Sequence, residues 1–327
     1  MAEPILKVRD LTTRFRLVER TITAVAGVSF DVQENEILAI VGESGCGKSV
    51  TILSLMNLIQ PPGFIDPASR VLFEGRNLLE LEERELAAVR GGRIAMVFQE
   101  PSASFNLLFT VGAQIAEALR IHRGLSREKA LEQARDLLRQ VRIPAGERRA
   151  RDYPFQLSGG MLQRSMIALA LSCSPSLLLA DEPTTALDAT VQAQILALLK
   201  EKSSAGGMSV IFVTHDFALI DGFANRVIIM YAGRILECCS SREILEQPAH
   251  PYTQDLLKAI PRLGVFKDEQ RLYSIAGRVP EPGNLPSGCT YAPRCRLRFG
   301  KCEVEPELLR AGGNGKKNHT VRCWLFA

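Results

Sequence analysis

The sequence lacks any apolar run long enough to cross a bilayer. Its longest apolar runs, at 37–41, 177–180 and 227–230, fall far short of the roughly 18 residues that a spanning helix needs. The first residues, MAEPILKVRD, also lack the basic segment followed by an apolar stretch that marks a secretory signal. We therefore expect the chain neither to span a membrane by itself nor to leave the cytosol.

A strong charge of one sign, an internal repeat and paired C-x-x-C sequences are absent as well. The net charge of +4 is too small to argue for nucleic acid as a partner. The last 39 residues alone carry +5, from eight basic side chains, Lys316 and Lys317 among them, against three acidic ones, so the rest of the chain is close to neutral. What is present is ordinary for a globular protein: 327 residues, 46% hydrophobic and 23% charged, enough for one large α/β domain and an appendage.

Strand-like and helical segments alternate along most of the chain. This order predicts a mostly parallel sheet with helices on its faces, and a hairpin around 232–233 at the edge of the sheet. The expected strands are 37–41, 71–73, 94–97, 177–180, 210–213 and 227–230, and the expected helices are 48–58, 111–122, 127–141, 160–173 and 190–202.

The strongest local signal is GESGCGKS at 42–49, which lies between a strand and a helix. It matches G-x-x-x-x-G-K-[ST], a loop whose backbone N–H groups grip phosphate oxygens at the positive end of a helix. Lys48 is expected to reach the outer phosphates and Ser49 to bind Mg²⁺. We expect the nucleotide to contact Gly42, Glu43, Ser44, Gly45, Cys46, Gly47, Lys48, Ser49 and Val50.

Two carboxylates follow the apolar run 177–180. A run this apolar predicts a buried strand, so Asp181 and Glu182 are expected at its carboxyl end, where α/β proteins bind ligands. Beside a phosphate loop, Asp181 would contact Mg²⁺ and Glu182 would polarise the attacking water. The alternative is that one of the two only caps the turn into Pro183.

A second phosphate-binding device lies between these motifs. Ser158, Gly159 and Gly160 begin a strongly helical run, and such a helix start binds anions. One chain rarely needs two devices for one phosphate, so we expect two subunits to face each other, each closing the other's nucleotide site. The tripeptide could also be a helix cap alone.

Taken together, these motifs resemble the ATP-binding subunit of an ABC (ATP-binding cassette) transporter. The resemblance covers residues 5 to about 240 and rests on 42–49, Gln99 in MVFQEP, LSGGM at 157–161, LLLADE at 177–182, ALD at 186–188, and His215 in VTHD. It implies a P-loop α/β fold with an antiparallel β subdomain and a helical subdomain at about 100–172.

The resemblance also assigns roles to residues that carry no signal by themselves. Gln99 would contact Mg²⁺ or the water, His215 the γ-phosphate, and Asp188 the subunit interface. Gln163 would join Ser158, Gly159 and Gly160 against the partner's ATP, although Met161 departs from the commonest LSGGQ wording. Phe15 is expected under the adenine ring.

The C-terminal segment narrows the family. HPYTQDLLKAIPRL at 250–263 and the following GCTYAPRCRLRFGKC resemble the ATPase subunits of oligopeptide and dipeptide importers, whose relatives move nickel or glutathione. That resemblance implies two membrane permease subunits, a second ATPase subunit that is not identical, an extracytoplasmic binding protein, and a place on the cytoplasmic face of the membrane. Pro248, Pro251 and Pro261 put the end of the ATP-binding domain near residue 245, leaving 246–327 as an extension.

Four of the eight cysteines lie in this extension, at 289, 295, 302 and 323. A disulfide is not expected in a reducing cytosol, and the spacing lacks the C-x-x-C pairs typical of structural zinc. Four loosely spaced thiolates suit a [4Fe-4S] cluster, which the resemblance supports, and nearby Arg and Lys side chains are expected to favour the thiolate form. Four ordinary or zinc-bound cysteines remain the alternative.

Residues 99–119 are the expected contact with the membrane subunits, because Phe105 and Phe109 look exposed there; ordinary packing within a helical subdomain is the alternative. A soluble ABC ATPase acting on DNA or ribosomes is the rival function. Only about 110 residues separate Gly42 from Ser158, with no long heptad run between them, and the chain has one cassette, which disfavours that rival. A P-loop kinase would leave LSGGM and the C-terminal segment unexplained.

Overall fold

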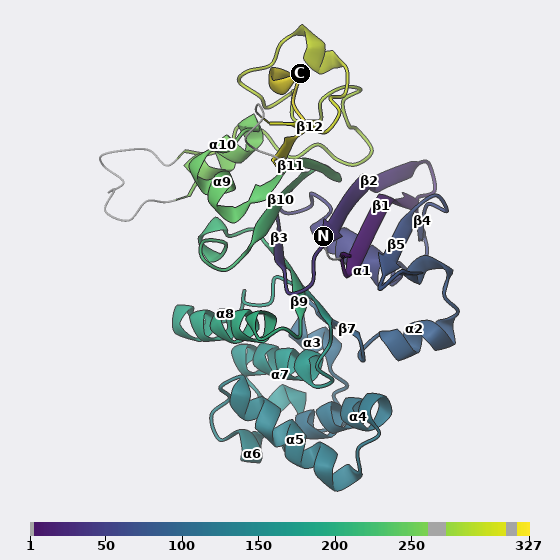
Figure 1. The fold of residues 1–327 in the computed structure, drawn as a ribbon, viewed down its shortest axis with the longest axis vertical. Helices are drawn as coiled ribbons and strands as arrows, with labels where there is room; N and C mark the ends of the chain where they lie inside the picture. Colours follow the sequence, from purple (N-terminus) through teal and green to yellow (C-terminus); the bar gives the residue numbers. More distant parts are fainter. Residues whose placement is uncertain (1–2, 261–272, 312–318) are drawn as a thin grey trace. The chain divides into compact units, whose positions relative to one another are not determined.

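A computed structural model describes residues 3–260, 273–311 and 319–327 (Figure 1). They form two compact units. Unit 1 comprises the described residues of Met1–Leu6, Val32–Ile37 and Phe73–Val213, and unit 2 those of Lys7–Asp31, Leu38–Leu72 and Thr214–Ala327. Pro261, Lys316 and Lys317 lie outside the described residues. Within those residues, no helix combines the length and the apolar character that a bilayer crossing requires.

Unit 1 contains the parallel strands β9 (Ser209–Thr214), β8 (Leu177–Asp181) and β7 (Ile94–Val97), in that order across the sheet. Every residue of β8 and β9 is buried, as expected for parallel strands covered on both faces. The predicted strands are therefore confirmed here.

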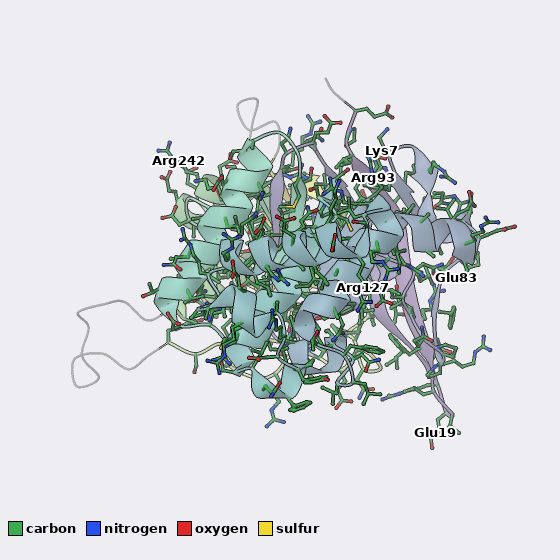
Figure 2. The ribbon with its side chains drawn as sticks, turned by 90° about the horizontal axis from the view of Figure 1, so that it is seen from below. Lys7, Glu19, Glu83, Arg93, Arg127 and Arg242 are labelled. Atoms are coloured by element: carbon green, nitrogen blue, oxygen red, sulfur yellow. The ribbon has the colours of Figure 1, made fainter. Side chains whose placement is uncertain are left out.

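The helices of unit 1 begin at polar caps. Thr110, Ser126 and Ser158 each accept a hydrogen bond from a backbone N–H in the first turn of α4, α5 and α7, which contact one another below the strands in Figure 1. The charged side chains of Glu83 and Arg127, labelled in Figure 2, are exposed. Besides the three strands above, the elements of unit 1 are β6 (Arg76–Asn77), η1 (Leu78–Glu80), α2 (Glu83–Val89), α3 (Pro101–Ser104), α4 (Val111–Arg123), α5 (Arg127–Gln140), α6 (Gly146–Arg149), η2 (Pro154–Gln156), α7 (Gly159–Leu171) and α8 (Ala189–Ser204).

Unit 2 contains strands of two sheets. In the first, β2 (Thr21–Val32), β1 (Leu6–Arg16) and β5 (Arg70–Phe73) lie side by side, and β4 (Gly63–Ile65) pairs antiparallel with β1. In the second, β3 (Ile37–Val41) pairs in parallel with β10 (Arg226–Tyr231), which forms an antiparallel hairpin with β11 (Arg234–Ser240). The remaining elements of this unit are α1 (Lys48–Leu55), η3 (Phe217–Leu219), α9 (Ser241–Glu246), α10 (Pro251–Lys258), η4 (Gly300–Glu303), β12 (Leu309–Arg310), β13 (Thr320–Val321) and η5 (Trp324–Phe326).

The hairpin is confirmed, but its predicted place at the sheet edge is wrong. β13 pairs antiparallel with β11, with Glu237 opposite Val321, and β12 pairs with β13. The sheet is extended by chain about 80 residues further along, a long-range pairing that no local pattern signals. The domain boundary near 245 stays a prediction, although residues on both sides of it belong to unit 2.

Glu237 fastens the C-terminal segment to β11. Its carboxylate has 0% exposure and accepts hydrogen bonds from the backbone N–H groups of Ala249 (2.7 Å) and His250 (2.9 Å). It also accepts one from the Thr253 hydroxyl (2.6 Å) and lies 2.7 Å from Nε2 of His319. A buried carboxylate is stable only when fully hydrogen-bonded, and this one is.

Candidate functional site

The phosphate loop of unit 2 joins β3 to α1. Gly47 caps α1 with a φ of 103°, a backbone conformation that side chains rarely adopt, and no side chain caps the helix. No acidic residue lies in its first turn, so its free N–H groups form an anion site. Lys48 is buried and donates from Nζ to the carbonyls of Gly42 (2.7 Å) and Glu43 (3.0 Å).

Close backbone packing shapes this loop. A Cβ on Gly47 would lie 2.6 Å from the carbonyl oxygen of Ala24, and one on Gly42 would lie 2.2 Å from that of Met230. The Gly233 N–H donates to the Cys46 carbonyl at 2.8 Å. Burial raises the pKa of the Cys46 thiol, which favours its neutral form.

Glu43 is held by the C-terminal segment. Its carboxylate pairs with both terminal nitrogens of Arg294, at 2.8 and 3.1 Å, and its backbone N–H donates to the Tyr252 hydroxyl at 3.0 Å. Sequence reasoning missed both Tyr252 and Arg294. A signal was present, because Arg294 is a cation between two cysteines of a segment predicted to hold a cluster.

Four further predicted residues belong to unit 2. Phe15, at the end of β1, lies opposite Gly63 of β4, where a Cβ would approach its ring to 2.7 Å. The ring is half-buried. His215 directly follows β9 and is exposed, while Ser49 and Val50 lie in the first turn of α1.

The carboxylates of unit 1 lie at the carboxyl end of β8, as predicted. Asp181 is 4% exposed, and Glu182 leaves the strand with a φ of 47°, an unusual conformation for a residue with a side chain. The Glu182 N–H donates to the carbonyl of Val213 at 3.0 Å, and the Thr185 hydroxyl donates to the Glu182 carbonyl at 3.1 Å. Such strain of about 1–3 kcal/mol clusters at functional sites. Gln99 is exposed beyond the same end of neighbouring β7.

The start of α7 is joined to the turn after β8. Gln163 is 1% exposed; its Nε2 donates to the Glu182 carbonyl (3.3 Å), and its Oε1 accepts from the Ala186 N–H (3.1 Å). Its contact with a partner's nucleotide stays a prediction, but both ends of its amide are engaged by this turn. Ser158 caps the helix by accepting the Met161 N–H (3.3 Å) and is exposed together with Gly159, and whether capping is its only role stays open.

The remaining contacts of this region involve small and capping residues. Gly160 lies where a Cβ would approach the Ala186 carbonyl oxygen to 3.1 Å. Asp188 is exposed and caps α8 by accepting the Val191 N–H at 3.0 Å. Unit 1 thus brings the start of α7, which carries the signature sequence LSGGM, into direct contact with residues 181–186, the carboxylate turn.

The four cysteines of the C-terminal segment line one cavity in unit 2. Apolar and aromatic residues such as Phe299 and Trp324 complete its lining. The thiols that line it are Cys289, Cys295, Cys302 and Cys323. They come together from separate turns, as the predicted cluster requires.

Three of the four thiols of this cavity are harder to ionise than predicted. Burial raises the pKa of Cys289 to about 11 and also raises the pKa of Cys295 and Cys323. The expectation that nearby Arg and Lys side chains favour thiolate is therefore wrong for the free protein, because loss of hydration outweighs those charges. Metal binding would have to displace the protons.

The chain is similar to known proteins over nearly its whole length. The profile of the ABC transporter family matches residues 25–185, and that of the oligopeptide/dipeptide transporter C-terminal region matches residues 236–302. A probable peptide ABC transporter ATP-binding protein of Sinorhizobium fredii is 48% identical, covering 99% of this chain and 95% of its own. The dipeptide transport ATP-binding protein DppD of Bacillus subtilis is 44% identical over the same shares.

A solved structure supports the fold. The dimeric ATP-binding cassette MJ0796, bound to ADP and Pi in a post-hydrolysis state, is 31% identical with a TM-score of 0.66. The alignment covers 72% of this chain and 99% of the cassette. The predicted α/β fold is confirmed by this likeness together with the strands described above.

Proposed function

Because the chain belongs to the ABC transporter family, among the ATP-binding proteins of peptide importers, we propose that it hydrolyses ATP to drive uptake of oligopeptides or dipeptides through separate membrane proteins. The choice of cargo is carried by the C-terminal match at 236–302, since the ATPase motifs are common to the whole family. The relatives named for peptide and dipeptide transport support it.

In this proposal the phosphate loop binds ATP and the carboxylate turn acts on water. Backbone N–H groups of 42–49 and Nζ of Lys48 hold the phosphates, which requires Nζ to leave the carbonyls it now caps. Mg²⁺ would be bound by Ser49, Gln99 and Asp181, and it would neutralise charge that develops on the phosphates. Glu182 would polarise the water, with His215 at the γ-phosphate.

A second subunit would complete each site. The exposed Ser158 and Gly159 at the start of α7 present N–H groups that suit the phosphate of a partner's ATP. Asp188, exposed at the start of α8, would lie at that interface. We expect the partner to be a non-identical ATPase. Replacement of Glu182 by Gln should then trap an ATP-bound dimer; a variant that turns over ATP normally would refute the role of Glu182.

Residues 99–119 would dock the membrane subunits. Phe109 is 56% exposed and adjoins Leu107 and Leu108, which are 52% and 80% exposed, so an apolar patch is available for a short helix of the partner. Phe105 was expected to be exposed too, but it is 5% exposed and packs inside the unit. The permeases would hold this chain at the cytoplasmic face of the membrane.

Transport itself tests the cargo. We expect the chain, assembled in lipid nanodiscs with its two permeases, its second ATPase and its binding protein, to hydrolyse ATP faster when peptide-loaded binding protein is added. Stimulation by a nickel-loaded or glutathione-loaded binding protein alone would overturn the peptide assignment. ATPase activity that responds to DNA or ribosomes and to no binding protein would overturn the transport assignment.

We propose that the four thiols of the cysteine cavity hold a [4Fe-4S] cluster and not one zinc ion. Tetrahedral Zn–S bonds of about 2.3 Å put the sulfurs only about 3.8 Å apart. Among the described residues, the group whose ligand atoms all lie within 4.8 Å is Glu237, Cys239 and His319, and no three of the cavity thiols form such a group. In a [4Fe-4S] cluster each of the four irons binds one cysteine sulfur, so the four sulfurs lie further apart than around a single zinc ion.

Metal analysis tests the cluster. Protein purified without oxygen should contain about four irons and four acid-labile sulfides per chain. It should also absorb visible light, and this absorbance should decrease when the cluster is reduced. Cys302→Ser should lose this content, whereas Cys173→Ser, outside the cavity, should keep it. Stoichiometric zinc without iron would contradict the proposal.

A further inference from the structure

Glu43 is an unfavourable residue for a loop that grips phosphate. It is the second residue of the loop, and a free carboxylate there would repel the multiply charged polyphosphate of a nucleotide. The carboxylate is not free, because both of its oxygens accept hydrogen bonds from the Arg294 guanidinium at 2.8 and 3.1 Å. Two parallel bonds of this kind form the strongest type of charge pair in proteins.

Arg294 is fixed in place by aromatic rings and by backbone. Its side chain is only 6% exposed, and its guanidinium carbon lies 5.8 Å from the ring centre of Tyr231 and 5.9 Å from that of Tyr291. Its Nε donates to the carbonyl of Ala276 at 2.9 Å. The hydrogen bond and the charge of Glu43 raise the pKa of Arg294 despite its burial, so the cation persists.

The position of Arg294 is set by the cysteine segment. Its backbone N–H donates to the carbonyl of Tyr291 (3.0 Å), and the next N–H, that of Cys295, donates to the carbonyl of Ala292 (3.3 Å). Arg294 is therefore part of the tight turn between two thiols of the cavity. The same turn is tied to α10, because the Tyr291 hydroxyl donates to Asp255 at 2.7 Å.

We propose that Arg294 is a positioning residue for ATP: it neutralises Glu43 and holds that carboxylate away from the phosphates, so the C-terminal segment sets the nucleotide affinity of the loop. The proposal rests on the proposed phosphate-binding role of residues 42–49. Arg294 itself need not touch the nucleotide, since it acts through Glu43.

Calorimetric titration with MgADP, which is not hydrolysed, tests this. Arg294→Met should raise the Kd about tenfold or more. The double variant Arg294→Met with Glu43→Gln should return to within about threefold of wild type. If the pair only stabilised the structure, the double variant, which still lacks the pair, would bind MgADP as weakly as Arg294→Met.

Salt supplies a second readout. The ratio of the Kd of Arg294→Met to that of wild type should shrink as ionic strength rises from about 0.05 to 0.5 M, since the screening length falls below 10 Å over that range. Arg298→Met, an exposed cation in the same segment, is the matched control and should leave the Kd unchanged. If Arg294→Met does not fold, Arg294→Gln with and without Glu43→Gln makes the same comparison with a polar side chain.

Binding by Lys48→Ala distinguishes the role of Arg294 from the phosphate-binding role of residues 42–49. Normal MgADP binding by Lys48→Ala would overturn the phosphate-loop assignment itself. Loss of binding in Lys48→Ala together with an unchanged Kd in Arg294→Met, or a double variant as weak as Arg294→Met, would overturn only the role of Arg294.

Discussion

Replacing Glu237 with Gln should detach the C-terminal segment from β11. The carboxylate accepts bonds from the backbone of Ala249 and His250, from Thr253 and from Nε2 of His319, and all of them reach a side chain with 0% exposure. An amide keeps one acceptor oxygen for two of these donors and turns an NH₂ group toward the other two. Whichever way the amide turns, its NH₂ faces one backbone N–H that cannot accept, so at least one hydrogen bond to a charged group is lost and we expect about 1.5–3 kcal/mol of destabilisation.

Trp324, the only tryptophan, reports on this segment, because its Nε1 donates to the carbonyl of Val304 at 2.8 Å. Urea unfolding followed by its fluorescence gives the free energy by linear extrapolation. The control is Glu246→Gln, an exposed partner of Arg242, which should change it by less than about 0.5 kcal/mol. A loss below about 1 kcal/mol in Glu237→Gln would show that the buried carboxylate does not hold the segment.

The remaining predictions concern catalysis, pH and assembly. Glu182→Gln should lower kcat by about 10²-fold or more while MgATP still binds, measured by phosphate release and by calorimetry, because water activation is lost and the phosphate loop is intact. Burial lowers the pKa of His250 to about 4, below the ordinary 6.5, so the unfolded chain binds more protons between these values. The free energy of unfolding should therefore fall by about 3 kcal/mol as pH falls from 6.5 to 4. In His250→Asn, urea titrations should show a smaller fall over the same range; the same fall in both proteins would contradict this prediction. Phe109→Asp should abolish co-purification with the permeases and spare MgATP binding, whereas Phe105→Asp should unfold unit 1, seen by circular dichroism; permease binding by soluble Phe109→Asp would argue against the docking patch.

Local patterns were sufficient for much of the fold. The strands at 37–41 and 94–97 coincide with β3 and β7 because short apolar runs between turns leave little choice of register. Helix ends were less well placed: α1 ends at Leu55 instead of 58, and Asn57 takes a φ of 50°, which is not a helical conformation. Phe105 was misassigned because exposure depends on tertiary packing.

The candidate site was predictable as motifs but not as contacts. The phosphate loop and the pair Asp181 and Glu182 are chemically distinctive over a few residues. The pair formed by Glu43 and Arg294 joins positions 251 residues apart, and no periodicity or spacing signals such a contact. The raised pKa values of the cavity thiols likewise depend on burial, which composition near the cysteines could not indicate.

The pairing of β13 with β11 also bears on solubility. A fragment that stops near residue 245 would leave Glu237 and Cys238 of β11 without their strand partners Val321 and Thr320, in a strand rich in Ile, Leu and Cys. Uncovered strands of this kind pair with other chains and aggregate. β13 thus covers part of the edge of β11. Soluble expression of the isolated ATP-binding domain should require either this strand or charged substitutions on β11.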